Sequence, residues 1–348
     1  MIDICMYGCR GCNLSCSYCM GPQKTINEAF CLDEERLYQA IIQYKKRNPQ
    51  KSKGFVIWGG EPFLFFNEVK RTTEFIKSFF PNEGIMISTN GALLQKVEIR
   101  DFIKINKIKL QLSHDGIGQF IRSTYNPLED YIISPFLADL ANNNSLTINC
   151  IMNNKNFSIK QNINYFTKWM ENNNCLESNL NIRFTPFNES NLTPDFNLSG
   201  DNLKQFITEY EELYIRALLG SDKDKIYKHF TRGPLKQVRK SNFEIIKWDD
   251  CNQCSKFYSG KTNYSKHIDT KGNYICCNLI DSGITPRGKA EKKIPTYCKE
   301  CEFHSMRGCW PCPAADFPEK CEFKKAWMQF QERMLLLKKL YQSNTQKK

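Results

Sequence analysis

The first 219 residues alternate between short runs of β-branched and aromatic residues and longer amphipathic stretches. This alternation is typical of βα units, in which helices cover parallel strands. The expected strands are residues 2–6, 55–58, 85–88, 108–112, 146–151 and 180–184. The expected helices, several of which follow an Asn or Asp suited to N-capping, are residues 34–47, 68–79, 135–142, 156–171 and 201–219. Six such units predict an α/β fold, a partial (β/α)6 TIM-like barrel, with its chemistry at the carboxyl ends of the strands.

Three cysteines follow the first expected strand. Cys12, Cys16 and Cys19 have Cys-x3-Cys-x2-Cys spacing in the run Cys-Asn-Leu-Ser-Cys-Ser-Tyr-Cys. Three thiolates on one loop can ligate three irons of a [4Fe–4S] cluster and leave the fourth iron open to a small molecule, whereas four-cysteine sites are closed. A zinc knuckle is the alternative, for which Cys9 is the candidate fourth ligand.

A glycine-rich turn follows the second expected strand. Residues 54–58 read as a buried strand that continues into Gly59-Gly60-Glu61-Pro62. The glycines allow a tight turn and a close approach to a ligand, and the proline fixes the exit of the chain. Glu61 offers a carboxylate at the strand end, where the ammonium group of a ligand could sit.

The cysteine triplet and the Gly-Gly-Glu-Pro segment, in this order and about forty residues apart, resemble the radical S-adenosylmethionine (SAM) family. Tyr18, the aromatic residue before the third cysteine, also fits the family pattern. The resemblance implies that the open iron chelates SAM, and that reduction cleaves SAM to methionine and a 5′-deoxyadenosyl radical. This radical abstracts hydrogen from a substrate. The resemblance also implies a low-potential electron donor such as a flavodoxin or ferredoxin.

Polar turns follow the third and fourth expected strands. Thr89 and Asn90 lie in Ser-Thr-Asn-Gly, where such side chains either bind a ligand or simply form the turn. In the resembled family, a Ser-x-Asp-Gly segment follows the fourth strand, and its serine and a nearby arginine hold the ribose and carboxylate of SAM. The resemblance implies this role for Ser113, Asp115 and Arg122, and a guanidinium can bond a carboxylate bidentately.

The predicted SAM-binding residues are thus Tyr18, Gly59, Gly60, Glu61, Thr89, Asn90, Ser113, Asp115 and Arg122. His114 lies between two of them. Strand alternation directs its side chain to the opposite face, which favours a packing role over a catalytic one. The sequence identifies no catalytic base.

Nine of the 17 cysteines lie in residues 251–321, which show little regular periodicity. This segment resembles the SPASM extension of many radical SAM enzymes, which houses two auxiliary [4Fe–4S] clusters. The final cysteine of a Gly-x4-Cys match is Cys277, but the later spacings of two, seven and two residues depart from the usual two, five and three. The resemblance implies one cluster on Cys251, Cys254, Cys277 (or Cys276) and Cys312, and another on Cys298, Cys301, Cys309 and Cys321. A zinc ribbon is the alternative for the Cys-x2-Cys pairs.

Four segments are expected: a barrel in residues 1–219, a basic connector in 220–250, a cluster domain in 251–321, and a C-terminal helix and tail in 322–348. The helix is predicted from an apolar stripe with steps of three and four residues, formed by Phe323, Trp327, Phe330, Met334, Leu337 and Tyr341. The connector has seven Lys or Arg between Lys223 and Lys240, a pattern more typical of a solvated face than of a docking strip.

The composition of the chain limits the compartments and the binding partners to be expected. The chain has no apolar run long enough for a membrane span, and its N-terminus lacks a signal-type segment, so a cytoplasmic location is expected. In that reducing compartment the cysteines favour metal ligation over disulfides. The net charge of +12 favours an acidic partner. Nucleic acid is disfavoured because no aromatic residues interleave the basic ones.

Radical SAM proteins with this extension often modify peptides or proteins, while others oxidise small alcohols. In the sulfatase-maturing relatives an Asp follows the Gly-x4-Cys cysteine, and Asn278 stands here instead, which argues against that reaction. The predicted substrate is a peptide or protein side chain, modified by crosslinking or dehydrogenation. The alternative is oxidation of a small alcohol or sugar, because no peptide-recognition domain is expected before Cys12.

Overall fold

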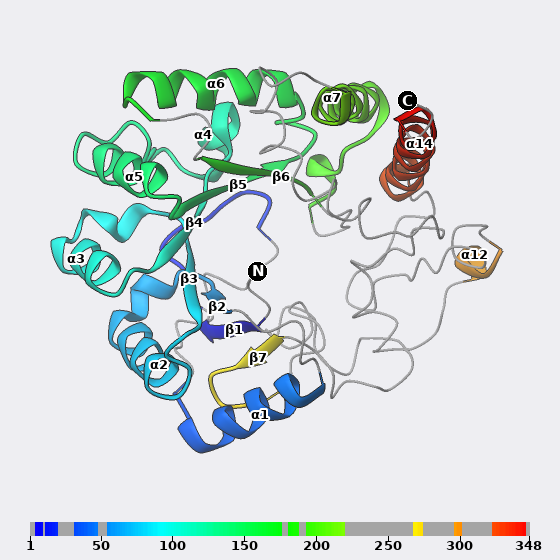
Figure 1. The fold of residues 1–348 in the computed structure, drawn as a ribbon. Helices are drawn as coiled ribbons and strands as arrows, with labels where there is room; N and C mark the ends of the chain where they lie inside the picture. The colour runs from blue at the N-terminus through cyan, green and yellow to red at the C-terminus, as the bar shows by residue number, and fades with distance from the viewer. Residues whose placement is uncertain are drawn as a thin grey trace.

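The computed structural model describes residues 4–9, 11–19, 31–47, 54–175, 180–187, 193–219, 267–273, 296–300 and 322–345. Their centre is a seven-stranded parallel sheet in the order β6-β5-β4-β3-β2-β1-β7. The strands are β1 (Ile4–Cys9), β2 (Gly54–Gly59), β3 (Gly84–Thr89), β4 (Lys109–Ser113), β5 (Leu146–Met152), β6 (Asn181–Pro186) and β7 (His267–Asp269). Figure 1 shows that the sheet curves and that the helices lie outside the curve, as in a barrel that does not close. The predicted partial barrel is confirmed.

All five predicted helices of the barrel form, with ends shifted by up to three residues. They are α1 (Glu34–Arg47), α2 (Phe66–Phe79), α5 (Ile133–Asn142), α6 (Ile159–Asn172) and α7 (Gly200–Leu219). Helix α6 begins later than expected because Ser158, not an Asn, caps it by accepting a hydrogen bond from the Gln161 N–H. None of the described helices is both long and apolar enough to cross a membrane.

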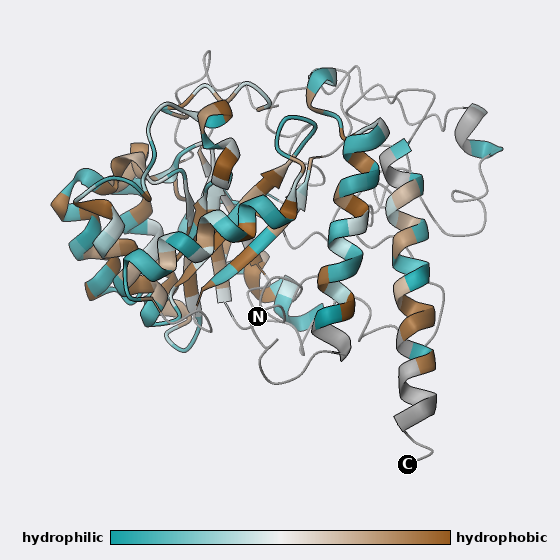
Figure 2. Ribbon diagram, turned by 90° about the horizontal axis from the view of Figure 1, so that it is seen from above, coloured by the Kyte–Doolittle hydropathy of each residue, from teal (hydrophilic) through white to brown (hydrophobic). Residues whose placement is uncertain are grey.

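Two faces of the sheet differ in chemistry. In β4, Leu110 and Leu112 are buried against the helices, whereas Gln111 and Ser113 alternate with them and are half-buried. The same alternation continues in the neighbouring strands, so the face turned away from the helices, which we call the inner face, is partly polar. The hydropathy colouring in Figure 2 shows apolar residues along the strands.

Several described elements were not expected, among them two helices and a strand of the barrel. Helix α3 (Val97–Ile105) has nine residues, and α4 (Gln119–Arg122) has four, which is too short for a clear periodic pattern. Strand β7 has three residues and pairs with β1 in parallel register. The β7 segment also contacts α1, where Arg36 donates a hydrogen bond to the Asn273 side chain (3.0 Å). Residues from the cysteine-rich part of the sequence thus extend the barrel sheet.

The predicted C-terminal helix is α14 (Glu322–Thr345), and it packs along α7 (Figures 1 and 2). Phe330 is 1% exposed and its ring lies 5.6 Å from that of Tyr210. Trp327 stacks on Phe206 with the ring centroids 6.1 Å apart. The aromatic contacts explain why the apolar stripe of this helix faces the barrel. A short helix, α12 (Thr296–Lys299), lies between the two ends of the cysteine-rich segment.

We expect Phe330→Ala to lower the free energy of unfolding by about 3–5 kcal/mol, because it removes a fully buried ring. Anaerobic urea denaturation measures this change. The matched control on the same helix is Leu336→Ala, which should change the stability by less than about 0.5 kcal/mol since Leu336 is 58% exposed. Equal effects of the two substitutions would contradict the packing of α14 on α7.

Candidate active site

The loop that carries the three cysteines leaves β1 and lies against the end of β2. The Gly60 N–H donates to the Cys9 carbonyl (3.2 Å), and the Glu61 N–H donates to the Gly11 carbonyl (2.8 Å). A side chain at Gly59 is excluded, because its Cβ would lie 2.4 Å from the Cys9 carbonyl oxygen. Gly59 is therefore needed for the close packing of two backbone segments, and the predicted approach of a ligand to these glycines stays a prediction.

Glu61 is fully buried and its carboxylate is bonded within the protein. One oxygen accepts from the Thr89 hydroxyl (2.9 Å) and the Phe63 N–H (3.1 Å), and the other accepts from the Asn90 N–H (2.7 Å). Burial raises the pKa of Glu61 to about 7, although these hydrogen bonds act in the opposite direction. Its carboxylate joins the ends of β2 and β3, and the predicted contact with a ligand's ammonium group stays a prediction.

Asn90 contacts the cysteine loop directly. Its side-chain nitrogen donates to the Asn13 side chain (2.8 Å) and lies 3.8 Å from the Cys12 sulfur, while its oxygen accepts from the Ala92 N–H (2.9 Å). Thr89 is bonded to Glu61 and accepts from the Gly91 N–H (3.1 Å). These contacts support the turn-forming interpretation of both residues and add a contact to the first cysteine.

On the other side of the loop, Asp115 is buried among three donors. One carboxylate oxygen accepts from the Arg122 guanidinium (3.2 Å) and the Ile151 N–H (3.0 Å), and the other accepts from the Tyr18 hydroxyl. Arg122 also lies over the Tyr18 ring, 5.6 Å from its centroid. Tyr18 and Arg122, both predicted to bind SAM, thus meet on a third predicted residue, and the carboxylate of Asp115 is engaged within the protein.

Ring contacts and two further hydrogen bonds also hold the cysteine loop in place. The Tyr18 ring makes edge contacts with Phe187 and Phe196 at centroid distances of 6.0 and 5.8 Å. Both the backbone N–H and the hydroxyl of Ser17 donate to the Ile121 carbonyl, at 3.4 and 3.3 Å. The loop is therefore held by segments after β4 and β6 as well as by β2.

The turn that carries Asp115 is braced by two asparagines that sequence reasoning missed. Asn156 donates to the Asp115 carbonyl (2.9 Å), and the Asn162 oxygen accepts from the Ile117 N–H (3.2 Å). Gly116 has φ +59°, and a Cβ there would lie 2.0 Å from the Asn162 oxygen. The sequence gives no signal for this role, because both residues fall in the stretch expected as a helix, residues 156–171, and Asn162 does lie within α6.

His114 has the predicted packing role. It is fully buried, one ring nitrogen accepts from the Gly116 N–H (3.0 Å), and the other lies 2.7 Å from the Asn126 side-chain oxygen. The first bond requires an unprotonated nitrogen, so the neutral ring fits the site. Burial lowers the pKa of His114 to about 4. Ser113, by contrast, is half-buried on the inner face.

The three cysteine sulfurs lie within electrostatic range of one another. Burial, together with negative charge on Cys19 and Cys12, raises the pKa of the Cys16 thiol to about 11. Arg122 acts in the opposite direction, and its guanidinium lies 4.0 Å from the Cys16 sulfur. A sulfur-only donor set with N–H groups directed at two sulfurs fits an iron–sulfur cluster, since ligation requires deprotonated thiols.

Among the described side chains, no three His, Cys, Asp or Glu converge on a position that could hold one metal ion. The ligands of a cubane cluster need not converge in this way, because each binds a different iron. Cys9, the candidate zinc ligand, is buried, and burial raises the pKa of its thiol to about 12.

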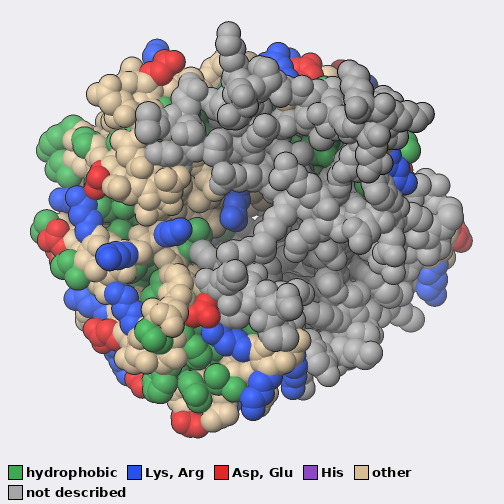
Figure 3. Space-filling view, viewed as in Figure 1, with side chains coloured by type: hydrophobic (Ala, Val, Ile, Leu, Met, Phe, Trp, Pro, Cys, Tyr) green, Lys and Arg blue, Asp and Glu red, His purple; other side chains and the backbone are tan. Residues whose placement is uncertain are grey.

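The predicted auxiliary-cluster cysteines lie outside the described side chains. Cys298 falls in α12, but its side chain is not described, and the others are outside the described residues: Cys251, Cys254, Cys276, Cys277, Cys301, Cys309, Cys312 and Cys321. The basic connector, residues 220–250, also lies outside them. Over the described part of the face in Figure 3, basic and acidic side chains are interspersed.

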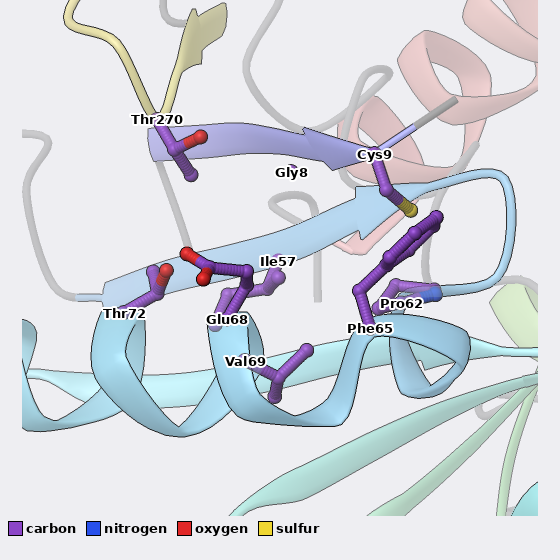
Figure 4. A pocket seen from close by; sticks show the side chains of 9 residues that line it. All are labelled: Gly8, Cys9, Ile57, Pro62, Phe65, Glu68, Val69, Thr72 and Thr270. Atoms are coloured by element: carbon purple, nitrogen blue, oxygen red, sulfur yellow. The ribbon is translucent and has the colours of Figure 1, made fainter. Parts of the chain in front are cut away.

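A small cavity lies between β1, β2 and α2, on the helix side of the sheet (Figure 4). Cys9, Glu68 and Thr72 are among its lining residues, and its volume is about 10 Å³. This volume suits at most one water molecule. The cavity is thus not a substrate site, and the polar groups of the inner face lie on the other side of the sheet.

Comparisons with known proteins give a family match and similar solved structures. Residues 6–131 match the family described as the radical SAM superfamily. No curated protein matches the chain. Native anSMEcpe with bound AdoMet is 15% identical, with a TM-score of 0.56 over 95% of this chain and 97% of that chain. The histidine-tagged form with bound AdoMet has the same identity and a TM-score of 0.53, over 95% of this chain and 93% of that chain.

A third structure is Streptococcus suis SuiB bound to precursor peptide SuiA, which is 16% identical and has a TM-score of 0.49. That match covers 80% of this chain and 60% of the SuiB chain. At such identities the anSMEcpe structures show a shared fold, and the cysteine loop lies inside the region matched by the family.

We expect His114 to weaken the fold as the pH falls from 6.5 toward 4. The folded pKa of about 4 is below the ordinary 6.5, so the unfolded chain takes up a proton that the native site resists, and stability is lost with falling pH. The loss is on the order of 3 kcal/mol. Urea denaturation at pH 7 and pH 4.5 measures it, and His114→Gln should lose less stability over this interval because it cannot titrate. Identical pH dependence in the two proteins would contradict the buried neutral ring.

Proposed function

We propose that this protein is a radical SAM enzyme that removes a hydrogen atom from a polar substrate, in the first instance a peptide or protein side chain. The observation that carries the proposal is the placement of the Cys12, Cys16 and Cys19 loop. It lies at the carboxyl ends of the strands and is held by residues at the ends of β2, β3 and β4. Ligands of parallel barrels bind at that edge.

Cys12, Cys16 and Cys19 would hold a [4Fe–4S] cluster. When bound, such a cluster supplies the electron that cleaves SAM to methionine and a 5′-deoxyadenosyl radical. The protein contributes position and exclusion of water. Tyr18, Asp115 and Glu61 fix the loop, and the half-buried Ser113 remains the predicted residue best placed to contact SAM.

Two auxiliary [4Fe–4S] clusters in residues 251–321 and a flavodoxin or ferredoxin as electron donor belong to the same proposal. They rest on the resemblance of the cysteine pattern to the SPASM extension. A cytoplasmic location belongs to it as well and rests on the need to keep the thiols reduced.

The inner face of the sheet supports a substrate with hydrogen-bonding groups. Ser88 pairs in register with Gln111, and Ser113 pairs with Asn149, whose side chain bonds the Thr185 hydroxyl at 2.6 Å. All five side chains are half-buried and belong to β3, β4, β5 and β6. A peptide offers matching donors and acceptors along its backbone. A small alcohol or sugar would also suit this face, and it is the second candidate.

The test of the chemistry is anaerobic. Protein reconstituted with iron and sulfide should bind about twelve irons if three cubane clusters form. With SAM and dithionite it should release 5′-deoxyadenosine, measured by liquid chromatography. Cys16→Ala should abolish this release because one iron loses its ligand.

The matched control is Cys31→Ala, which replaces an exposed cysteine outside the triplet and should retain release of 5′-deoxyadenosine. Bound zinc with no 5′-deoxyadenosine from the unmodified protein would overturn the proposal and favour a zinc-stabilised binding protein.

The two candidate substrate classes can be distinguished by their effects on the rate of SAM cleavage. Short peptides encoded next to the gene should accelerate 5′-deoxyadenosine release and should lose hydrogen or gain a crosslink by mass spectrometry. A panel of alcohols and sugars is the comparison. Acceleration by this panel and not by the peptides would select the second candidate.

A further inference from the structure

Arg122 bridges a buried acid and a cysteine of the predicted cluster loop. One terminal nitrogen is 3.2 Å from an Asp115 oxygen, and the other is 4.0 Å from the Cys16 sulfur. The side chains are 10% exposed for Arg122 and 1% for Asp115. The guanidinium therefore lies in a largely water-free environment, where a positive charge acts strongly on its neighbours.

The orientation of this guanidinium is fixed from several directions. Asp115 is itself held by the Tyr18 hydroxyl and the Ile151 N–H, and Arg122 lies over the Tyr18 ring. The Arg122 Nε is buried and has no hydrogen-bond partner among the described residues. The Nε of Arg122 therefore makes no hydrogen bond to the described residues, while the two terminal nitrogens contact Asp115 and Cys16. Such a geometry indicates that the contact with the sulfur is a defined feature of the site.

A second donor approaches the loop from the opposite side. The Asn90 side-chain nitrogen lies 3.8 Å from the Cys12 sulfur and is held in place by Asn13. The sulfurs of Cys12 and Cys16 therefore each have a side-chain N–H donor, neutral for the first and charged for the second. Hydrogen bonds to the sulfurs and nearby charge are two of the factors that set the reduction potential of an iron–sulfur cluster.

We propose that Arg122, through Cys16, and to a smaller extent Asn90, through Cys12, raise the reduction potential of the SAM-binding cluster. Both are positioning residues that act through the cysteine sulfurs. Reduction adds negative charge to the cluster, and a fixed positive charge stabilises the reduced form more than the oxidised form. The inference rests on the proposed function, because it requires the cluster on Cys12, Cys16 and Cys19. It assigns Arg122 to the cluster instead of to the carboxylate of SAM.

The test is a redox titration followed by electron paramagnetic resonance on the full chain with its clusters. The signal that changes when SAM is added identifies the SAM-binding cluster among the three. Arg122→Gln should change the reduction equilibrium at least tenfold toward the oxidised form, which corresponds to a negative shift of about 59 mV for one electron. Arg122→Lys keeps the positive charge but loses the planar guanidinium. The potential of the cluster in this variant should lie between those in the unmodified protein and in Arg122→Gln.

Two further variants keep the result interpretable. Arg71→Gln makes the same change of charge on an exposed side chain of α2 and should leave the potential unchanged. Asn90→Ala removes the donor to Cys12 without adding a charge, so it should shift the potential negatively even if Arg122→Gln fails to fold.

An unchanged potential in Arg122→Gln would overturn the inference. So would an unchanged potential with weakened SAM binding, since that result assigns Arg122 to the cofactor. Failure of the unmodified protein to assemble a SAM-responsive cluster is a different outcome, which refutes the proposed function itself.

Discussion

The burial of Asp115 is the constraint on which the candidate site depends. A carboxylate with 1% of its side chain exposed must be compensated, because an unpaired buried charge costs several kcal/mol. Here the compensation comes from three separate segments, through Tyr18, Arg122 and the Ile151 N–H. The hydrogen bonds to this one carboxylate therefore bring the cysteine loop, the turn after β4 and the end of β5 together.

The loop is fixed on its other side by a second buried acid. Glu61 joins the ends of β2 and β3, and its own backbone N–H bonds the loop at Gly11. A loop held by the protein from both sides loses less conformational freedom when it binds a ligand, so more of the binding energy remains for affinity. The two carboxylates therefore support the loop from within the protein, and the thiols are the groups that we propose as ligands.

Sequence patterns predict the elements of this fold better than the roles of its polar residues. The six strands and five helices follow from periodicity, and the loop position follows from β1 and β2, because carboxyl ends of parallel strands share one edge. The internal bonds of Glu61 and Asp115 could not be predicted, because their partners, such as the Ile151 N–H, are distant in sequence. Helix α4 and strand β7 are too short for a periodic signal, and Asn156 and Asn162 lie in a stretch whose pattern predicts only a helix.

The choice of arginine at position 122 follows from geometry as well as charge. The planar guanidinium has donors at both ends of a rigid fork, so one side chain can reach an acid and a sulfur together. A lysine has a single ammonium group and would have to favour one of them. Because Asp115 is fixed by Tyr18 and Ile151, the free end of the fork is directed at Cys16 without any contribution from the sulfur. The protein therefore places a positive charge beside Cys16, and this asymmetry distinguishes Cys16 from Cys12, whose side-chain donor is the neutral amide of Asn90.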